Sequence, residues 1–375
     1  MLPATRFSWL FATQFFALGA AMPFVPVALA NGGLSPEWVG LVLAMGTAVR
    51  LVAGLVSARV SEVVGARSVL VLGSVVAGLT LPGLALVEGV FLLALVQAVH
   101  GVAVAPIVPL SDAAATAEIR RRPFDYGRVR AWGSVAFILA AVMAGQAVVW
   151  GGPLAALCLA GVALLGTGIV ASGIAPPPAG REVVRSSLWA PLWVAGFPRL
   201  LLCSALIQSS HAVYYGFSSL HWRAAGLSPS LIGALWAWGV LAEVLLFFFG
   251  GRAVAWLGPH GLALLAASCG ILRWSVTAIT VDVPTLFAVQ ALHAATFGAM
   301  HLAAIRAMGS MPSRLGPHAQ SLHSALGVGL ASGLMMLVSG PLYARMEGHA
   351  FLVMAGVCGL GLVAAAGLPF RRPVR

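Results

Sequence analysis

Charged residues are scarce in this sequence: they make up only 8% of its 375 residues, and lysine does not occur at all. A soluble domain carries about 25% charged residues. The chain is 60% hydrophobic, with a mean hydropathy of +0.99, which excludes an ordinary soluble fold. Apolar runs of about 20 residues recur along its whole length, and each is long enough to cross a bilayer as a helix. The sequence therefore predicts an all-α protein with many membrane spans.

Several motifs of catalysis are also missing. The chain contains no G-x-x-x-x-G-K-[ST] nucleotide-binding motif, no H-E-x-x-H metal motif and no G-x-S-x-G nucleophile motif. These absences argue against an ATP-driven pump and against an intramembrane enzyme, and we expect no cofactor and no metal. The four cysteines, Cys158, Cys203, Cys269 and Cys358, lie in apolar runs, so we expect small buried side chains rather than disulfides.

The arginines predict how the spans are oriented. We place twelve membrane helices at 7–30, 36–57, 68–87, 90–115, 128–149, 153–174, 197–222, 229–250, 259–280, 284–308, 318–342 and 349–368. With these spans, 17 of the 21 arginines fall on one side and two on the other, Arg223 and Arg345. By the positive-inside rule both termini are then cytoplasmic. A net charge of +11 arranged in this way indicates membrane topology and no nucleic-acid partner.

The chain also repeats itself. At an offset of 193 residues, Gly33–Pro36 falls on Gly226–Pro229, both with the sequence GLSP, and VQAVHG falls on VQALHA. The second match places Gln97 on Gln290 and His100 on His293. One offset serves two helices without a gap, which indicates a duplication. We predict an N-terminal six-helix bundle (1–175), a Pro-rich cytoplasmic linker (176–195) and a C-terminal six-helix bundle (196–375).

Two parallel six-helix repeats resemble the major facilitator superfamily (MFS), whose halves are related by an axis along the membrane normal. Three stretches are similar to the 3-phenylpropionate (hydrocinnamate) permeases of that superfamily: Pro109–Phe137, Gln208–Val244 and Ala291–Arg306. The resemblance implies the major facilitator fold, a substrate site near the midplane between rocking halves, and proton-coupled import with an aromatic carboxylate as the prototype substrate.

Two ionisable residues occupy the same repeat position with opposite charge. Arg50 and Glu243 each lie 14 residues after a proline, Pro36 or Pro229, so about 21 Å along a helix. Buried charge within a span is costly, about 2.5–3.5 kcal/mol per residue on insertion scales, and tends to mark function. We predict that Glu243 exchanges the proton and that Arg50 holds the substrate carboxylate. The alternative is that both stabilise helix contacts.

Other polar residues on the expected cavity helices are candidates for substrate binding. Histidine can donate to a carboxylate or carry a proton near neutral pH, and a tyrosine can stack on an aromatic ring while its hydroxyl binds the carboxylate. For the glutamines, hydrogen bonds between helices are an equal alternative. The candidates besides Arg50 are Gln97, His100, His211, Tyr214, Tyr215, Gln290, His293 and His301.

Four more charges are expected to serve structure or gating. Asp112 ends the fourth helix, and Arg128 and Arg130 begin the fifth, so a charge-assisted pair between them would latch this hairpin. Proton transfer by Asp112 is the alternative. Arg273 lies in the middle of the ninth helix, which the fold places at the periphery, so we expect a structural partner for it.

The leading hypothesis is a secondary transporter in the bacterial inner membrane that takes up a small organic anion together with protons. We expect it to act as a monomer in the lipid bilayer. The alternatives are an exporter with the same fold, a channel and, least favoured, an intramembrane enzyme.

Overall fold

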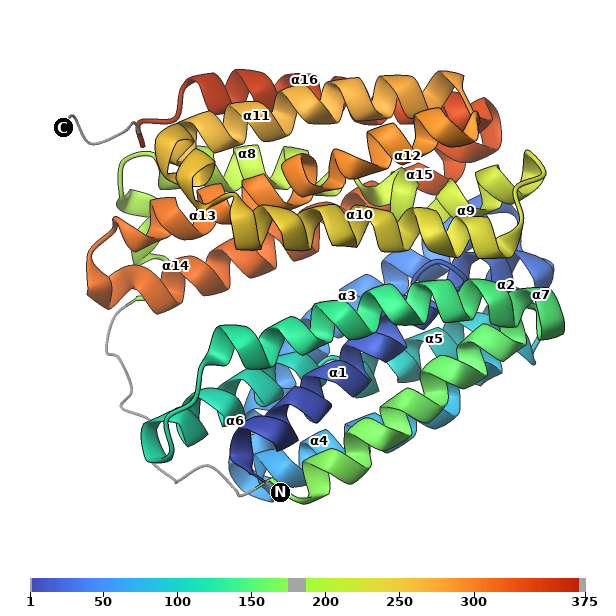
Figure 1. The fold of residues 1–375 in the computed structure, drawn as a ribbon, viewed down its shortest axis with the longest axis horizontal. Coiled ribbons are helices and arrows are strands. Elements are labelled where there is room, and N and C mark those ends of the chain that lie inside the picture. The colour runs from blue at the N-terminus through green and yellow to red at the C-terminus, as the bar shows by residue number, and fades with distance from the viewer. Residues whose placement is uncertain (1, 175–186, 371–375) are drawn as a thin grey trace. The chain divides into compact units, whose positions relative to one another are not determined.

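The computed structural model describes residues 2–174 and 187–370, and this part of the chain is helical, without a strand (Figure 1). By length and composition, eight of its helices can cross a membrane, or nine if one bent pair is a single span. An all-α protein with many spans is therefore confirmed. The count of twelve stays a prediction.

Contacts divide the chain into two compact units. Unit 1 comprises residues 1–180 with 219–237, and unit 2 comprises 181–218 with 238–375. The predicted bundle boundaries at 175 and 196 stay a prediction, and most of the expected linker, 175–186, lies outside the described residues. Each unit is considered by itself below.

Unit 1 begins with a broken span, α1 (Pro3–Ala21) and α2 (Val25–Asn31), which meet at 41°. It continues with α3 (Pro36–Val64), α4 (Ala66–Thr80), α5 (Val90–Val104), α6 (Ile107–Arg121) and α7 (Tyr126–Ser172). The 47 residues of α7 are too many for one span of about 30 Å. Its backbone leaves helical geometry at Gly151 and Gly152, and Gly152 has φ of 65° just before Pro153. This break falls where we placed the end of the fifth helix and the start of the sixth.

Unit 2 contains most of the remaining helices. They are α8 (Phe197–Ser209), α11 (Gly251–Ile279), α12 (Val283–Ala291), α13 (Met300–Gly309), α14 (Gly316–Leu322), α15 (Ala331–Met346) and α16 (Ala350–Ala366). Two segments inside these spans are π-helices, η3 (Ala294–Ala299) and η5 (His323–Leu330). Two helices, α9 (Ala212–Ala224) and α10 (Pro229–Phe249), are divided between the units.

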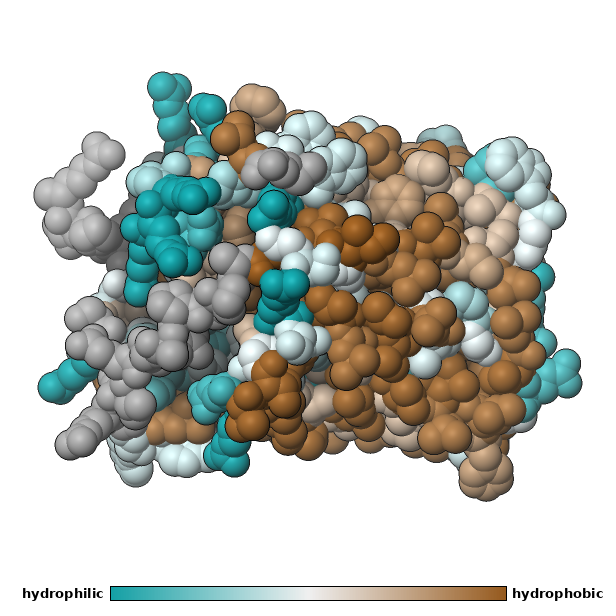
Figure 2. Space-filling model, turned by 90° about the horizontal axis from the view of Figure 1, so that it is seen from below, coloured by the Kyte–Doolittle hydropathy of each residue, from teal (hydrophilic) through white to brown (hydrophobic). Residues whose placement is uncertain are grey.

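The surface is suited to lipid. Large apolar side chains stand exposed along the spans, among them Leu72, Phe91, Val162 and Ile169. Figure 2 shows one face on which hydrophobic side chains cover a broad area and hydrophilic ones gather toward the ends. Because a soluble protein rarely exposes so large an apolar area, this face is expected to contact acyl chains.

An arginine closes each unit in the same way. Arg6 at the start of α1 donates from Nη1 to the carbonyl of Gly173, at the end of α7. Arg199, at the start of α8 and 193 residues later, donates from Nη1 to the carbonyl of Gly367, at the end of α16. Each unit thus ties its first helix to its last through a carbonyl that the helix end leaves unpaired. The offset found in the sequence therefore relates contacts as well as residues.

Some sequence predictions need correction. The second span was expected to end at residue 57, but α3 continues to Val64. The ninth was expected to begin at 259, but α11 begins at Gly251 and breaks at Gly258 (φ 63°). Cys203 and Cys358 are buried as expected, whereas Cys158 is exposed, because an apolar residue in a membrane helix can face lipid as readily as protein. All four thiols are free.

Candidate functional site

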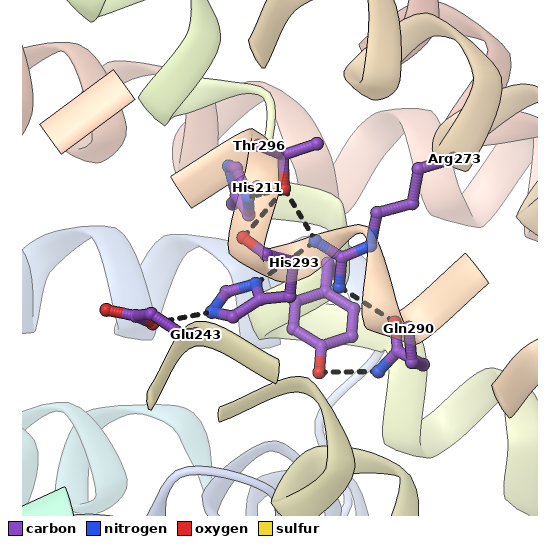
Figure 3. A network of polar contacts seen from close by, with 7 residues as sticks. His211, Glu243, Arg273, Gln290, His293 and Thr296 are labelled. Carbon is purple, nitrogen blue, oxygen red and sulfur yellow. Dashed lines mark hydrogen bonds and ion pairs between the residues drawn. The ribbon is translucent and has the colours of Figure 1, made fainter. Parts of the chain in front are cut away.

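A chain of polar contacts runs through unit 2 from a carboxylate to a buried arginine (Figure 3). Glu243 Oε2, from α10, lies 3.5 Å from Nε2 of His293, which directly precedes η3. The other ring nitrogen, Nδ1, lies 3.1 Å from Arg273 Nη1 on α11. His293 therefore bridges Glu243 and Arg273.

Arg273 is the centre of this network and is fully buried (0% exposed). Its Nη1 donates to Thr296 Oγ1 at 3.0 Å, and its Nη2 donates to Gln290 Oε1 at 2.7 Å. With the His293 bond, three of its N–H groups bind uncharged acceptors. Two aromatic rings lie against the guanidinium, Trp274 at 4.4 Å and Tyr214 at 4.8 Å from ring centroid to Cζ. Ring faces attract a cation, so they offset part of the cost of burial.

Two more side chains complete the network. Gln290 Nε2 donates to the hydroxyl oxygen of Tyr214 at 2.9 Å, so its amide is bonded on both sides. His211 Nε2 lies 3.2 Å from Thr296 Oγ1, and its ring stacks on Tyr215 at 5.7 Å. We define the "Arg273 network" as His211, Tyr214, Glu243, Arg273, Gln290, His293 and Thr296.

The Arg273 contact fixes the state of His293. A guanidinium nitrogen only donates, so His293 Nδ1 must accept and carries no proton. In the neutral ring the proton then sits on Nε2, which faces Glu243. A doubly protonated ring would set an N–H against Arg273. His293 is therefore held neutral, and the group of this chain that can change its charge is the Glu243 carboxylate.

Unit 1 holds the corresponding residues in a different arrangement. His100 Nδ1 lies 3.2 Å from the carbonyl oxygen of Ala77 and 3.4 Å from Thr80 Oγ1, on α4. Arg50, on α3, acts electrostatically on His100, and its side chain is accessible. The Gln97 amide packs on Gly46, where an added Cβ would overlap Gln97 Nε2. The structure thus groups Arg50, His100 and Gln97 in unit 1.

The hairpin between α6 and α7 differs from the expected latch. Tyr126 donates its hydroxyl to Asp112 Oδ1 at 2.8 Å. Arg128 pairs with Asp125 (Nε to Oδ2, 3.3 Å), which also caps α7 by accepting from the Arg128 backbone N–H. Arg128 is therefore taken by its near neighbour in the chain. Arg130 acts electrostatically on Asp112, and its guanidinium carbon lies 3.9 Å from the centre of the Phe15 ring.

The other predicted residues fall beside the network or apart from it. Tyr215 is half-buried next to His211. His301, on α13, is exposed. Arg273 has partners within unit 2, as a structural role would require, but these partners are the predicted site residues Gln290 and His293.

Sequence reasoning missed Thr80 and Thr296. Both were within reach of the repeat, because 80 plus 193 is 273: Thr80 occupies the position in unit 1 that Arg273 occupies in unit 2. Thr296 follows His293 by three residues, the spacing of neighbours on one helix face. A threonine in an apolar helix is too common for its spacing alone to select it.

Comparisons with known proteins agree with this architecture. The model of the MFS_1 like family matches residues 5–353. The chain is 35% identical over 367 residues to the probable 3-phenylpropionic acid transporter of Escherichia coli strain K12, covering 95% of each chain. It is 24% identical over 363 residues to the maltose permease of Geobacillus stearothermophilus, covering 94% of this chain and 91% of the permease.

Solved structures show the same fold. The nucleoside transporter NupG superposes with a TM-score of 0.84 at 15% identity, over 98% of this chain and 99% of that one. A bacterial homologue of the human lysosomal transporter Spinster, inward-facing and unoccupied, superposes with a TM-score of 0.75 at 13% identity, over 99% and 98%. These relatives and neighbours are transporters, and none is an enzyme.

Proposed function

Because this chain belongs to the MFS_1 like family and is a multi-pass membrane transporter of the MFS type, we propose that it takes up a small organic acid together with protons. An aromatic carboxylate such as 3-phenylpropionate is the proposed substrate, and the bacterial inner membrane, with both termini in the cytoplasm, is the proposed location. The chain carries no ATP-binding motif, so an ion gradient is the natural source of energy.

The observation that carries the proton coupling is the contact between Glu243 and the neutral side of His293. An ionised Glu243 accepts the Nε2–H of His293, which links it through His293 to the Arg273 guanidinium. Once Glu243 binds a proton it loses its charge, and this attraction weakens. Protonation thus changes how α10 is held to η3 and α11. A transporter needs such a link between proton binding and helix movement.

Substrate recognition is proposed for unit 1, where Arg50 is the accessible cation. A guanidinium binds a carboxylate through two parallel hydrogen bonds. His100 and Gln97 lie beside it, and we propose that they contribute polar contacts. The E. coli relative is named for an acid that carries one carboxylate and one aromatic ring, which fits this assignment.

For unit 2 we propose two groups of residues. Tyr214, Gln290 and His211 hold Arg273 and His293 in place, since their hydrogen-bonding groups are used within the network. Tyr215 and His301, which lie beside the network, are proposed to contact substrate. We keep Asp112, Arg128 and Arg130 as the proposed gating residues at the α6–α7 hairpin, with Tyr126 as the hydrogen-bond partner of Asp112.

The test uses purified protein in lipid vesicles, with radiolabelled 3-phenylpropionate as the probe. With an acidic outer medium, the wild type should accumulate the probe, and Glu243→Gln should lose accumulation while keeping exchange of labelled for unlabelled probe. Retention of exchange shows that the variant folds and binds. If Glu243→Gln still accumulates the probe against its gradient, Glu243 is not the proton site.

A second function, export through the same fold, is separated by the direction of the gradient. The proposed importer accumulates the probe when the outside is acidic. An exporter would instead remove preloaded probe under that gradient, and this result would overturn uptake.

A further inference from the structure

A second cluster of protonatable groups lies in unit 2, apart from the Arg273 network. Ser204 Oγ, on α8, is 2.8 Å from Nε2 of His323, the first residue of η5, and both side chains are buried. His301, on α13, acts electrostatically on His323. We define Ser204, His301 and His323 as the "Ser204 cluster".

These three residues stand at one depth in the membrane helices. Ser204 lies seven residues after the start of α8, His323 seven residues after the start of α14, and His301 eight residues before the end of α13. At 1.5 Å per residue, each is about 11–12 Å from its helix end. The proposed topology places all three helix ends in the cytoplasm. His301 is exposed, so the cluster includes one ring that water can reach.

The hydrogen bond between Ser204 and His323 tolerates a change of protonation. A hydroxyl both donates and accepts, so Ser204 donates to a bare Nε2 and accepts from a protonated one after its O–H rotates. His293 differs, because the guanidinium on its Nδ1 can only donate. The same residue type is thus fixed in one state at His293 and free to change state at His323.

Glu243 lies between the two sets of histidines. An added Cβ on Gly298 would be 3.2 Å from Glu243 Cγ, so the stem of Glu243 crosses the helix at Gly298. Its carboxylate meets His293, five residues before Gly298, and His301 comes three residues after it. A rotation of the Glu243 side chain about its own bonds would turn the carboxylate along the helix toward His301.

The π-helix η3 aligns this route. In an unbroken α-helix, eight residues turn about 800°, which would leave His301 about 80° away from His293. A π-turn holds about one residue more than an α-turn, so the eight residues behave like about seven, or close to two full turns. Because η3 lies between them, His293 and His301 come onto nearly one face of the helix.

No fixed charge competes at the cluster among the described residues that pack on it. On α8, Cys203 Sγ bonds to the carbonyl of Gly361, and Arg199 is held by Gly367. On α13, Arg306 lies five residues beyond His301, toward the helix end. His318 lies five residues before His323 on α14, and the titratable Tyr343 and Arg345 of α15 lie about 20 residues beyond His323.

From this geometry we propose that the Ser204 cluster is a second proton-binding site, through which the proton accepted by Glu243 leaves to the cytoplasm. This inference rests on the proposed proton coupling at Glu243. The Glu243 O–H bond breaks as an N–H bond forms on the imidazole of His301 or His323, and that N–H then gives the proton to water. No electrons are exchanged, and no other reactant is needed.

The test measures how transport depends on the pH of each side. Protein is reconstituted in vesicles, those oriented with the α8 and α14 ends inward are selected, and 3-phenylpropionate uptake is measured under an acidic outer medium. His323→Gln should slow this uptake about 10-fold or more, since a positioned proton carrier contributes typically 10²-fold or more to its step. Exchange of labelled for unlabelled probe at equal pH should stay at the wild-type rate, because exchange requires no proton release.

Two variants check the roles of the neighbours. Ser204→Ala should slow proton-driven uptake, and Ser204→Thr, which restores a hydroxyl, should recover it. His260→Gln, a histidine of α11 in the same unit, is the matched control and should leave uptake unchanged.

The outcomes separate this inference from the proposed function. If the wild type shows no response to a proton gradient, the coupling itself is wrong and the cluster has no role. If the wild type is coupled and His323→Gln accumulates the probe at the wild-type rate, the release site is wrong and the coupling at Glu243 stands. Equal loss of exchange and uptake would also overturn the release role, since it would place His323 in the transport movement itself.

Discussion

The two units hold the same glutamine–histidine pair and use it differently. In unit 1, His100 faces Thr80 and a backbone carbonyl, and the nearby charge is Arg50. In unit 2, His293 faces Arg273, and the nearby charge is Glu243. Two substitutions at matching positions, Thr80 against Arg273 and Arg50 against Glu243, account for the contrast. Duplication preserved the helix frame, and exchange of single charges gave each unit a different chemistry.

The difference also shows in how tightly each pair is bonded. Both amide groups of Gln290 are used, by Arg273 and Tyr214. The oxygen of Gln97 is buried and has no hydrogen-bond partner among the described residues. An unsatisfied acceptor in a membrane helix is unfavourable, and it leaves a group that a ligand can satisfy. The unit with the incomplete network is thus the better place for a substrate.

The largest expected effect comes from making unit 2 resemble unit 1. Arg273→Thr removes the donor that keeps His293 neutral, and it leaves Gln290 Oε1 and His293 Nδ1 without that partner. We expect proton-driven uptake of 3-phenylpropionate to fall to the level of vesicles without protein. The control at the matching position of unit 1, Thr80→Ser, keeps the hydroxyl and should leave uptake unaltered. Full uptake by Arg273→Thr would refute the role of the guanidinium.

Next in size is the loss of the cation in unit 1. Arg50→Gln should raise the KM for 3-phenylpropionate about 10- to 100-fold, since a hydrogen bond to a charged group contributes about 1.5–3 kcal/mol. The dependence on a pH gradient should remain, because Glu243 is untouched. The matched control is Arg59→Gln, an exposed arginine on the same helix. A KM equal to that of the wild type would remove Arg50 from the substrate site.

A moderate difference is expected between the two glutamines. Gln290→Leu strands Arg273 Nη2 and the hydroxyl of Tyr214, at about 1–3 kcal/mol for each buried group left unpaired. Gln97→Leu removes an amide whose oxygen is already unpaired, so it should destabilise the protein less. Thermal unfolding in detergent measures both variants. A larger loss for Gln97→Leu would contradict the comparison.

The smallest effect concerns helix packing at matching glycines. An added Cβ at Gly46 would overlap Gln97 Nε2, whereas at Gly239 the nearest atom, His293 Cβ, is 3.4 Å away. Gly46→Ala should therefore force the Gln97 side chain to move and lower the melting temperature slightly. Gly239→Ala should leave it unchanged. Equal melting temperatures would mean that Gln97 yields without cost.

Much of this organisation could be predicted from the sequence, because a bilayer imposes strong rules. Span length and arginine placement follow from the hydrocarbon core, and the offset of 193 residues carries across helices without interruption. The pairing of Gln290 and His293 on one helix was foreseen from their spacing. The family resemblance seen in three stretches is confirmed by a relative that covers 95% of the chain.

Contacts between helices were harder to predict. Arg273 was expected among structural ion pairs, yet the acceptors that the structure places on it are His293, Gln290 and Thr296. Its direction around the helix axis depends on packing, which hydropathy cannot give. The π-helices η3 and η5 were not foreseen, since a π-turn has no residue signature comparable to proline or glycine. Such a turn rotates every side chain beyond it, so spacing arguments fail across it.

The two arginine closures, Arg6 on Gly173 and Arg199 on Gly367, bear on how the transporter would tolerate its own driving force. A guanidinium does not give up its proton under physiological conditions. An acidic exterior therefore leaves the fastening of first helix to last unaltered in both units, even while carboxylates and imidazoles elsewhere respond. The framework stays insensitive to acidity, and that insensitivity lets a few sensitive side chains act as the moving parts.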